Sequence, residues 1–266
     1  MHINNIVFFI EMFIVSAVMS LYFLEVYVIC KKSNRHLFKS SFYVLFVFGA
    51  FMDLIFEIVT TLSYRMPYTP IFNEFTVANA NTLWLQICFA MTFYCESVGD
   101  FSVVFIAINR LTAVVAGTRH EQIWRYLTPI SIVTILCGPL SLLWYMFLQP
   151  VHYVPVVIDG EVVYTGVPDT VTFPEYNHGV RMAFSMGGAA LICLVLYTTA
   201  AFYVRCRNIK QTDYDRKLFY YGVIMFLLGV IFAIYEMYIA VAEASKTINW
   251  IWIFNTVSWL IDLKCD

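Results

Sequence analysis

The sequence predicts an all-α membrane protein, a bundle of seven transmembrane helices with its N-terminus outside. Three observations lead to this prediction. Of the 266 residues, 61% are hydrophobic and 13% are charged, and the mean hydropathy is +0.75. Soluble domains carry about 25% charged residues, so lipid is the expected solvent. Long apolar runs recur along the chain, and lysine and arginine are concentrated in every second loop.

The apolar runs match the length that a bilayer requires, about 20 residues at 1.5 Å each. The first run lacks a basic segment before it and is too long for a signal peptide, so we interpret it as an uncleaved helix. The last run has only 16 residues. We interpret 1–266 as a single transmembrane domain. The predicted spans are 3–30, 41–63, 82–108, 126–149, 180–204, 218–242 and 248–263.

The distribution of basic residues predicts the orientation. The loops 31–40, 109–125 and 205–217 hold 12 of the 16 lysines and arginines. Loops rich in these residues stay in the cytoplasm. The N-terminus is therefore expected outside, and with seven spans Lys264 in the tail is expected inside.

Local signals refine the fourth span and the loop after it. Pro129 suits the first turn of that helix, and the Gly138-Pro139 pair predicts a kink inside it. The loop 150–180 is expected outside. Its residues 153–158 and 161–165 alternate in polarity around Asp159-Gly160, which predicts a β-hairpin over the mouth of the bundle.

Composition and motifs argue against several classes of function. The net charge of −2 gives no basic field for nucleic acid. The seven cysteines are scattered without a CxxC pair, which is neither a disulfide framework nor a zinc cluster. No protease, hydrolase or nucleotide-binding motif is present, and the five histidines lie in predicted loops or at the terminus. We expect no enzyme activity, no catalytic residues, no metal site and no cofactor.

Acidic residues within the predicted spans are the informative exceptions: Asp53, Glu57, Glu96, Asp100 and Glu236. Two pairs are spaced four residues apart, so each pair shares one helix face. No lysine or arginine lies at comparable depth. Acids at such depth cost about 2.5–3.5 kcal/mol each and usually mark function.

Three interpretations of these acids stay open. The carboxyl groups are protonated and bonded to hydroxyls or backbone carbonyls, because burial raises a carboxyl pKa. Alternatively, they bind a monovalent cation or a cationic ligand between the second and third helices. In the third interpretation they form a proton or ion path.

One stretch carries a family resemblance: Ala107–Val115 (AINRLTAVV), His120–Trp124 (HEQIW) and Tyr126–Ile132 (YLTPISI), with the Val-Pro pair at 154–155. It resembles the nematode serpentine chemoreceptors, most closely serpentine receptor class gamma, with class V as the near alternative. The fold is then expected to be like that of G-protein-coupled receptors. The resemblance implies a receptor in the plasma membrane of sensory-neuron cilia that detects a small molecule and signals through a heterotrimeric G protein.

The resemblance also implies roles for particular residues. Asn109 and Arg110 take the place of the acid-arginine pair of rhodopsin-like receptors, so both are candidates for G-protein coupling, although asparagine gives no ion-pair latch. Asp53 falls near the sodium-binding aspartate of those receptors, so an ion pocket of Asp53 and Asp100 is expected. A ligand pocket is expected to open outward between helices 2, 3, 5, 6 and 7. Its candidate residues are Glu57, Tyr94, Glu96, Asp100, Tyr235 and Glu236.

Other features depart from the receptor pattern. Cys88 lies where receptors place a disulfide, yet the 150–180 loop has no cysteine. The seventh span has no Asn-Pro-x-x-Tyr segment, and the sequence stops at Asp266. Two alternatives to a signalling receptor therefore stay open. One is a small transporter or channel that uses the intramembrane acids, and the other is a truncated, non-signalling relic of the receptor family.

Overall fold

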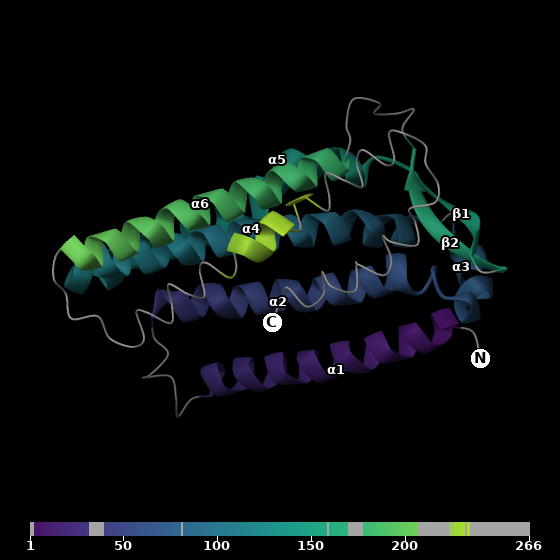
Figure 1. Cartoon of the computed structure of the whole chain (residues 1–266), viewed down its shortest axis with the longest axis horizontal. Helices are drawn as coiled ribbons and strands as arrows, with labels where there is room; N and C mark the ends of the chain where they lie inside the picture. Colours follow the sequence, from purple (N-terminus) through teal and green to yellow (C-terminus); the bar gives the residue numbers. More distant parts are fainter. Residues whose placement is uncertain are drawn as a thin grey trace.

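Long helices run side by side in the computed structural model, with a two-stranded hairpin at one end of the bundle (Figure 1). The seventh predicted span, 248–263, and most of the sixth, 218–242, lie outside the described residues. The structure describes residues 3–31, 40–80, 82–158, 160–169, 178–206, 224, 226–231 and 233–234.

The helices follow the apolar runs. Within the described residues, four stretches are long and apolar enough to cross a membrane: Asn5–Cys30, Ser41–Arg65, Leu83–Phe147 and Val180–Cys206. The third of these contains two helices, α4 and α5. The helical elements are α1 (Ile3–Cys30), α2 (Ser41–Thr60), the π-helical turn η2 (Thr61–Arg65), η3 (Pro70–Phe72), α3 (Asn73–Asn79), α4 (Leu83–Ala116), η4 (Gly117–Arg119), α5 (His120–Leu143), η5 (Trp144–Phe147) and α6 (His178–Cys206).

Helix α4 is central, because α2, α5 and α6 all pack against it. It continues about two turns beyond the predicted span end at 108. It stops at Gly117, whose φ of 52° lies in the left-handed region that favours glycine. A short 3₁₀ turn, η4, then leads directly into α5.

Two details of the fourth span are therefore wrong. The residues 109–125, predicted as a loop, are mostly helical, because α4 and α5 both extend into them. Pro129 lies nine residues after the start of α5 at His120, and not in its first turn. Gly138 and Pro139 lie within α5, which continues to Leu143. A Cβ at Gly138 would overlap the ring of Phe101, so glycine allows α5 to approach α4 closely.

The hairpin is confirmed. Strands β1 (Val151–Ile158) and β2 (Glu161–Pro168) pair antiparallel, and Ile158 is paired with Glu161 across a two-residue turn. Gly160 in that turn has a φ of 82°. At the other end of the hairpin a Cβ on Gly166 would lie 2.9 Å from the ring of Phe89, so the strand and α4 are in close contact.

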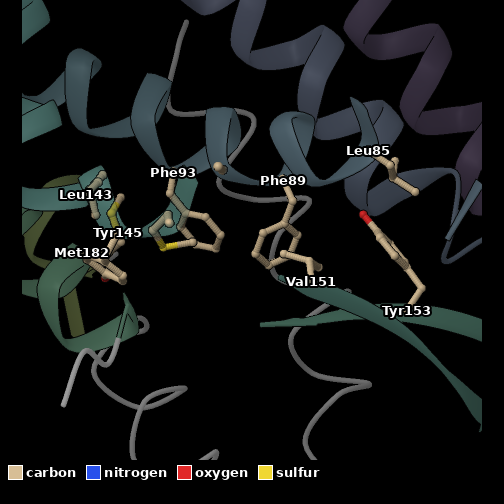
Figure 2. Packing of buried hydrophobic residues seen from close by; sticks show 10 residues of the cluster. Leu85, Phe89, Phe93, Leu143, Tyr145, Val151, Tyr153 and Met182 are labelled. Carbon is tan, nitrogen blue, oxygen red and sulfur yellow. The ribbon is translucent and has the colours of Figure 1, made fainter. Parts of the chain in front are cut away.

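The hairpin shares a core with the adjoining helix ends (Figure 2). Side chains from α4, η5, the strands and α6 interlock there, and Phe89 and Tyr145 are almost fully buried. A second core lies between α2, α4 and α5, around the buried Trp124. The described fragment of the sixth span packs on α6, because a Cβ on Gly229 would lie 2.9 Å from that of Ala190.

Candidate ligand and coupling sites

Asp100 lies buried at the contact between α4 and α6. Its side chain is 7% exposed, and the Ser185 hydroxyl donates a hydrogen bond of 3.0 Å to Oδ2. One turn nearer the start of α4, the Ser97 hydroxyl lies 3.4 Å from the sulfur of Met182. This face of α4 is therefore polar and is covered by α6.

Asp53 has different neighbours. It is half-buried on α2, and the hydroxyl of Tyr22 on α1 lies 3.5 Å from its Oδ2. One contact of Asp53 therefore comes from α1, whereas Ser185 on α6 contacts Asp100. The proposed shared ion pocket of Asp53 and Asp100 stays a prediction.

Glu57 is held in a buried ion pair. Its Oε2 lies 2.7 Å from Nη1 of Arg65, and each side chain is less than a tenth exposed. The same Nη1 donates a 3.0 Å hydrogen bond to the hydroxyl of Thr61. No lysine or arginine was expected at the depth of the acids; Arg65 lies eight residues further along, and η2 extends the helix so that its guanidinium reaches Glu57.

The π-helical turn also contacts the hairpin. Tyr153 on β1 donates a 2.9 Å hydrogen bond to the carbonyl oxygen of Ser63, and the hydroxyls of Ser63 and Thr92 lie 3.1 Å apart. Burial raises the pKa of Tyr153, with a smaller contribution from Cys88. In Figure 2 the Tyr153 hydroxyl points from the strand toward the helices. The backbone N–H of Tyr164 on β2 donates to Pro67 at 2.9 Å.

The remaining ligand candidates have different surroundings in the described residues. The Tyr94 hydroxyl donates to the carbonyl of Leu136 on α5 at 3.1 Å, and its ring contacts Phe147. Tyr94 and Asp100 are about 120° apart around α4. Glu96 is half-buried. Tyr235 and Glu236 lie outside the described residues.

The coupling candidates meet the beginning of α2. Asn109 is 1% exposed, and its Nδ2 donates a 2.8 Å hydrogen bond to the hydroxyl of Ser41. The guanidinium carbon of Arg110 lies 3.5 Å from the centroid of the Phe42 ring. Two successive residues of α4 therefore contact two successive residues of α2.

A second network joins α4 to α5 beside this contact. The indole N–H of the fully buried Trp124 donates a 2.6 Å hydrogen bond to the hydroxyl of Thr112. The same hydroxyl lies 3.3 Å from Nδ1 of His120. These contacts fix the turn between the two helices and explain why α5 begins at His120.

Sequence reasoning missed the partners of the candidate residues: Arg65, Tyr22, Ser185, Ser41 and Phe42. One of them carried a usable signal. Arg65 follows Glu57 by eight residues, a spacing that leaves the two about 80° apart around a regular helix, still on one side of it. The others contact their partners across helix interfaces, which local sequence does not specify.

The cysteines form no disulfide within the described residues. Cys88 is a free thiol, as are the other five cysteines of the described residues. Within the same residues, no group of three or more histidine, cysteine or acidic side chains is placed to hold a metal ion.

The fold and these sites define a class, a mostly helical, multi-pass membrane protein with polar contacts inside its helix bundle. Comparison with known families identifies it further. Residues 8–262 match the family model described as Srg family chemoreceptor. The chain belongs to this family, which is a family of chemoreceptors and not of enzymes. The resemblance to serpentine receptors is thereby confirmed.

Individual relatives from Caenorhabditis elegans agree. The chain is 21% identical to serpentine receptor class gamma-20 over 223 residues, 81% of this chain and 62% of the relative. It is 29% identical to serpentine receptor class gamma-15 over 128 residues, 46% of this chain and 39% of the relative. With serpentine receptor class V-1 the identity is 29% over 101 residues, 38% of this chain and 32% of that protein. The chain therefore matches less than two thirds of each of these relatives.

Proposed function

We propose that this chain is a seven-helix chemosensory receptor that binds a small molecule from outside and activates a cytoplasmic heterotrimeric G protein. Its spans are those given by the apolar runs, and its N-terminus lies outside. It works in the plasma membrane, in the cilia of a sensory neuron. The observation that carries the proposal is the match to a chemoreceptor family over residues 8–262.

The charge distribution supports the orientation. The three loops that begin after residues 30, 108 and 204 contain most of the basic residues, and such loops remain cytoplasmic. The hairpin and the turn η2 lie together, as the contact of Tyr153 with Ser63 requires. The contact of Asn109 with Ser41 joins the opposite ends of α4 and α2. The hairpin would then face outside and Arg110 the cytoplasm.

The ligand would bind near the polar face between α4 and α6. Asp100 supplies a buried carboxyl oriented by Ser185, and Glu96 lies one turn away on the same helix. Tyr235 and Glu236 of the sixth span would complete the site. Glu57 would contribute to the ligand site through its pair with Arg65, and Tyr94 would contribute to it through its packing on α5. A buried acid suits a cationic or hydrogen-bonding ligand.

Arg110 would couple the receptor to the G protein. The receptor would exist in two states, and the ligand would stabilise the one that opens toward the cytoplasm. Arg110 lies at the end of α4 that is expected in the cytoplasm and carries a permanent charge. Asn109 would hold that end of α4 against α2.

Mutation of Arg110 tests the proposal. The receptor would be co-expressed with each of a panel of Gα subunits, and basal guanine-nucleotide exchange would be measured in membranes. We expect Arg110→Ala to reach the cell surface normally and to abolish receptor-dependent exchange. Lys31→Ala, which removes an exposed charge at the end of α1, is the matched control and should keep exchange. Unchanged exchange in Arg110→Ala would contradict the proposed coupling.

A further inference from the structure

Where α4 meets α2, the charged side chain of Arg110 contacts an aromatic ring. The guanidinium carbon lies 3.5 Å from the centroid of the Phe42 ring, well within the roughly 6 Å reach of a cation–π contact. The preceding residue, Asn109, is buried and bonded to Ser41. Asn109 and Arg110 are successive in α4, and their partners are successive in α2. The two contacts therefore form one clasp between the first turn of α2 and the end of α4.

The physical chemistry of this clasp differs from that of an ion pair. An aromatic face attracts a guanidinium through its quadrupole and by stacking, without the desolvation cost of a second charge. Both side chains are half-buried, so solvent weakens the attraction only in part. While the guanidinium covers the ring, that face of Arg110 is withheld from a cytoplasmic partner.

We infer that Phe42 is the positioning residue of Arg110, and that its ring holds the arginine in the resting state of the receptor. This inference rests on the proposed function, because it concerns the same arginine. Activation requires Arg110 to leave the Phe42 ring. A receptor without that ring reaches the active state more easily and shows higher basal exchange.

Basal exchange of full-length Phe42 variants tests this role. Leucine removes the ring but keeps an apolar side chain, whereas tyrosine keeps the ring. A cation–π contact of ordinary strength predicts that Phe42→Leu raises basal exchange about two- to thirtyfold. Phe42→Tyr should match wild type. Phe51→Leu, at an exposed aromatic position of the same helix, is the control and should leave exchange unchanged.

A second measurement tests the contact without any G protein. Thermal unfolding in detergent would be followed for Phe42→Leu, Arg110→Gln and the double variant. If the two residues share one interaction, the double variant melts near the more destabilised single variant. If they act independently, the two shifts in melting temperature add.

The outcomes separate this inference from the proposed function. Additive shifts, or a Phe42→Leu receptor with wild-type basal exchange, would overturn the role of Phe42 while the effect of Arg110→Ala still supports coupling. Coupled shifts with no exchange from any variant or from wild type would leave the contact established, but would overturn both the proposed function and the resting-state role. Raised exchange in both Phe42→Leu and Phe42→Tyr would also contradict the inference. Tyrosine keeps the aromatic ring, so the ring would then not be what holds Arg110 in the resting state.

Discussion

Glu57 and Arg65 show how this molecule accommodates charge within a helix bundle. Each side chain is less than a tenth exposed, and their 2.7 Å contact neutralises both charges. Burying such a pair is costly, yet removing one partner costs more, because the other charge remains buried alone. We therefore expect the pair to fix where the π-helical turn lies more than to add net stability.

Mutations of the Glu57–Arg65 pair should lower the free energy of unfolding most when one charge is removed and the other remains buried. Glu57→Gln leaves the guanidinium uncompensated, and we expect it to lower the free energy of unfolding by about 3–5 kcal/mol. The double variant Glu57→Leu/Arg65→Leu should be closer to wild type than either Glu57→Leu or Arg65→Leu alone. Thermal unfolding of the purified receptor in detergent measures both effects.

Glu121 provides the control for this prediction. Its side chain is 59% exposed beside His120, and exposed pairs contribute about 0–1 kcal/mol. Glu121→Gln should therefore melt close to wild type. Equal destabilisation by Glu57→Gln and Glu121→Gln would show that the buried pair has no special role.

At this scale the sequence predicted where the acids lie but not what they contact. Asp100 and Glu57 were both expected inside the bundle, and both are buried. Ser185 and Tyr22 could not be assigned to the acids, because helix rotation and depth decide which hydroxyl reaches a given carboxyl. Only Arg65, on the same helix as Glu57, was within reach of sequence reasoning.

At the scale of elements, specific hydrogen bonds add to the shared core that attaches the hairpin to the helices. Tyr153 and Tyr164 contact the segment that follows α2, one through its hydroxyl and the other through its backbone N–H. Asn73 on α3 donates a 2.7 Å hydrogen bond to the Val162 carbonyl. The hairpin is thereby fixed over the ends of α2 and α4.

Alkaline pH should weaken this attachment through Tyr153. Burial raises its pKa above the ordinary value of 10.0, so the unfolded chain loses this proton first. Above about pH 10 the unfolded state therefore binds fewer protons than the folded state, and stability falls as pH rises. We expect Tyr153→Phe to be less stable than wild type near pH 8 by about 1–3 kcal/mol, because the Ser63 carbonyl loses its donor.

The difference between wild type and Tyr153→Phe should then shrink between pH 9 and pH 11, about one unit on either side of the ordinary tyrosine value. Melting temperatures at the two pH values measure this change, and ionisation of other tyrosines affects both proteins alike. Tyr164→Phe removes a half-buried hydroxyl from the same hairpin and is the matched control. A constant difference across this range would contradict the role given to Tyr153.

Elements were more predictable from the sequence than contacts. Apolar runs indicated α1, α2, α4, α5 and α6, and alternation around Asp159-Gly160 indicated the hairpin, because each signal is local. The beginning of α5 was missed, since it depends on Thr112 contacting Trp124 and His120 across a turn. The short helix α3 was missed because it has only seven residues and no complete apolar face.

At the scale of the whole molecule, the proposed function requires the two ends of the bundle to face different compartments. The hairpin and the Glu57–Arg65 pair are expected on the outer side, and Arg110 with Phe42 on the inner side. Asp100 lies ten residues before Arg110 in α4, about 15 Å along the helix. A ligand near Asp100 could therefore act on the clasp through α4 itself.

The sidedness of the two chain ends tests this account most directly. Glycosylation-acceptor tags would be placed before residue 1 and after residue 266, and the chain would be inserted into microsomes. Seven spans with the N-terminus outside predict that the N-terminal tag is glycosylated and the C-terminal tag is not. Glycosylation of both tags would mean that 248–263 does not cross the membrane, and would contradict a seven-helix receptor.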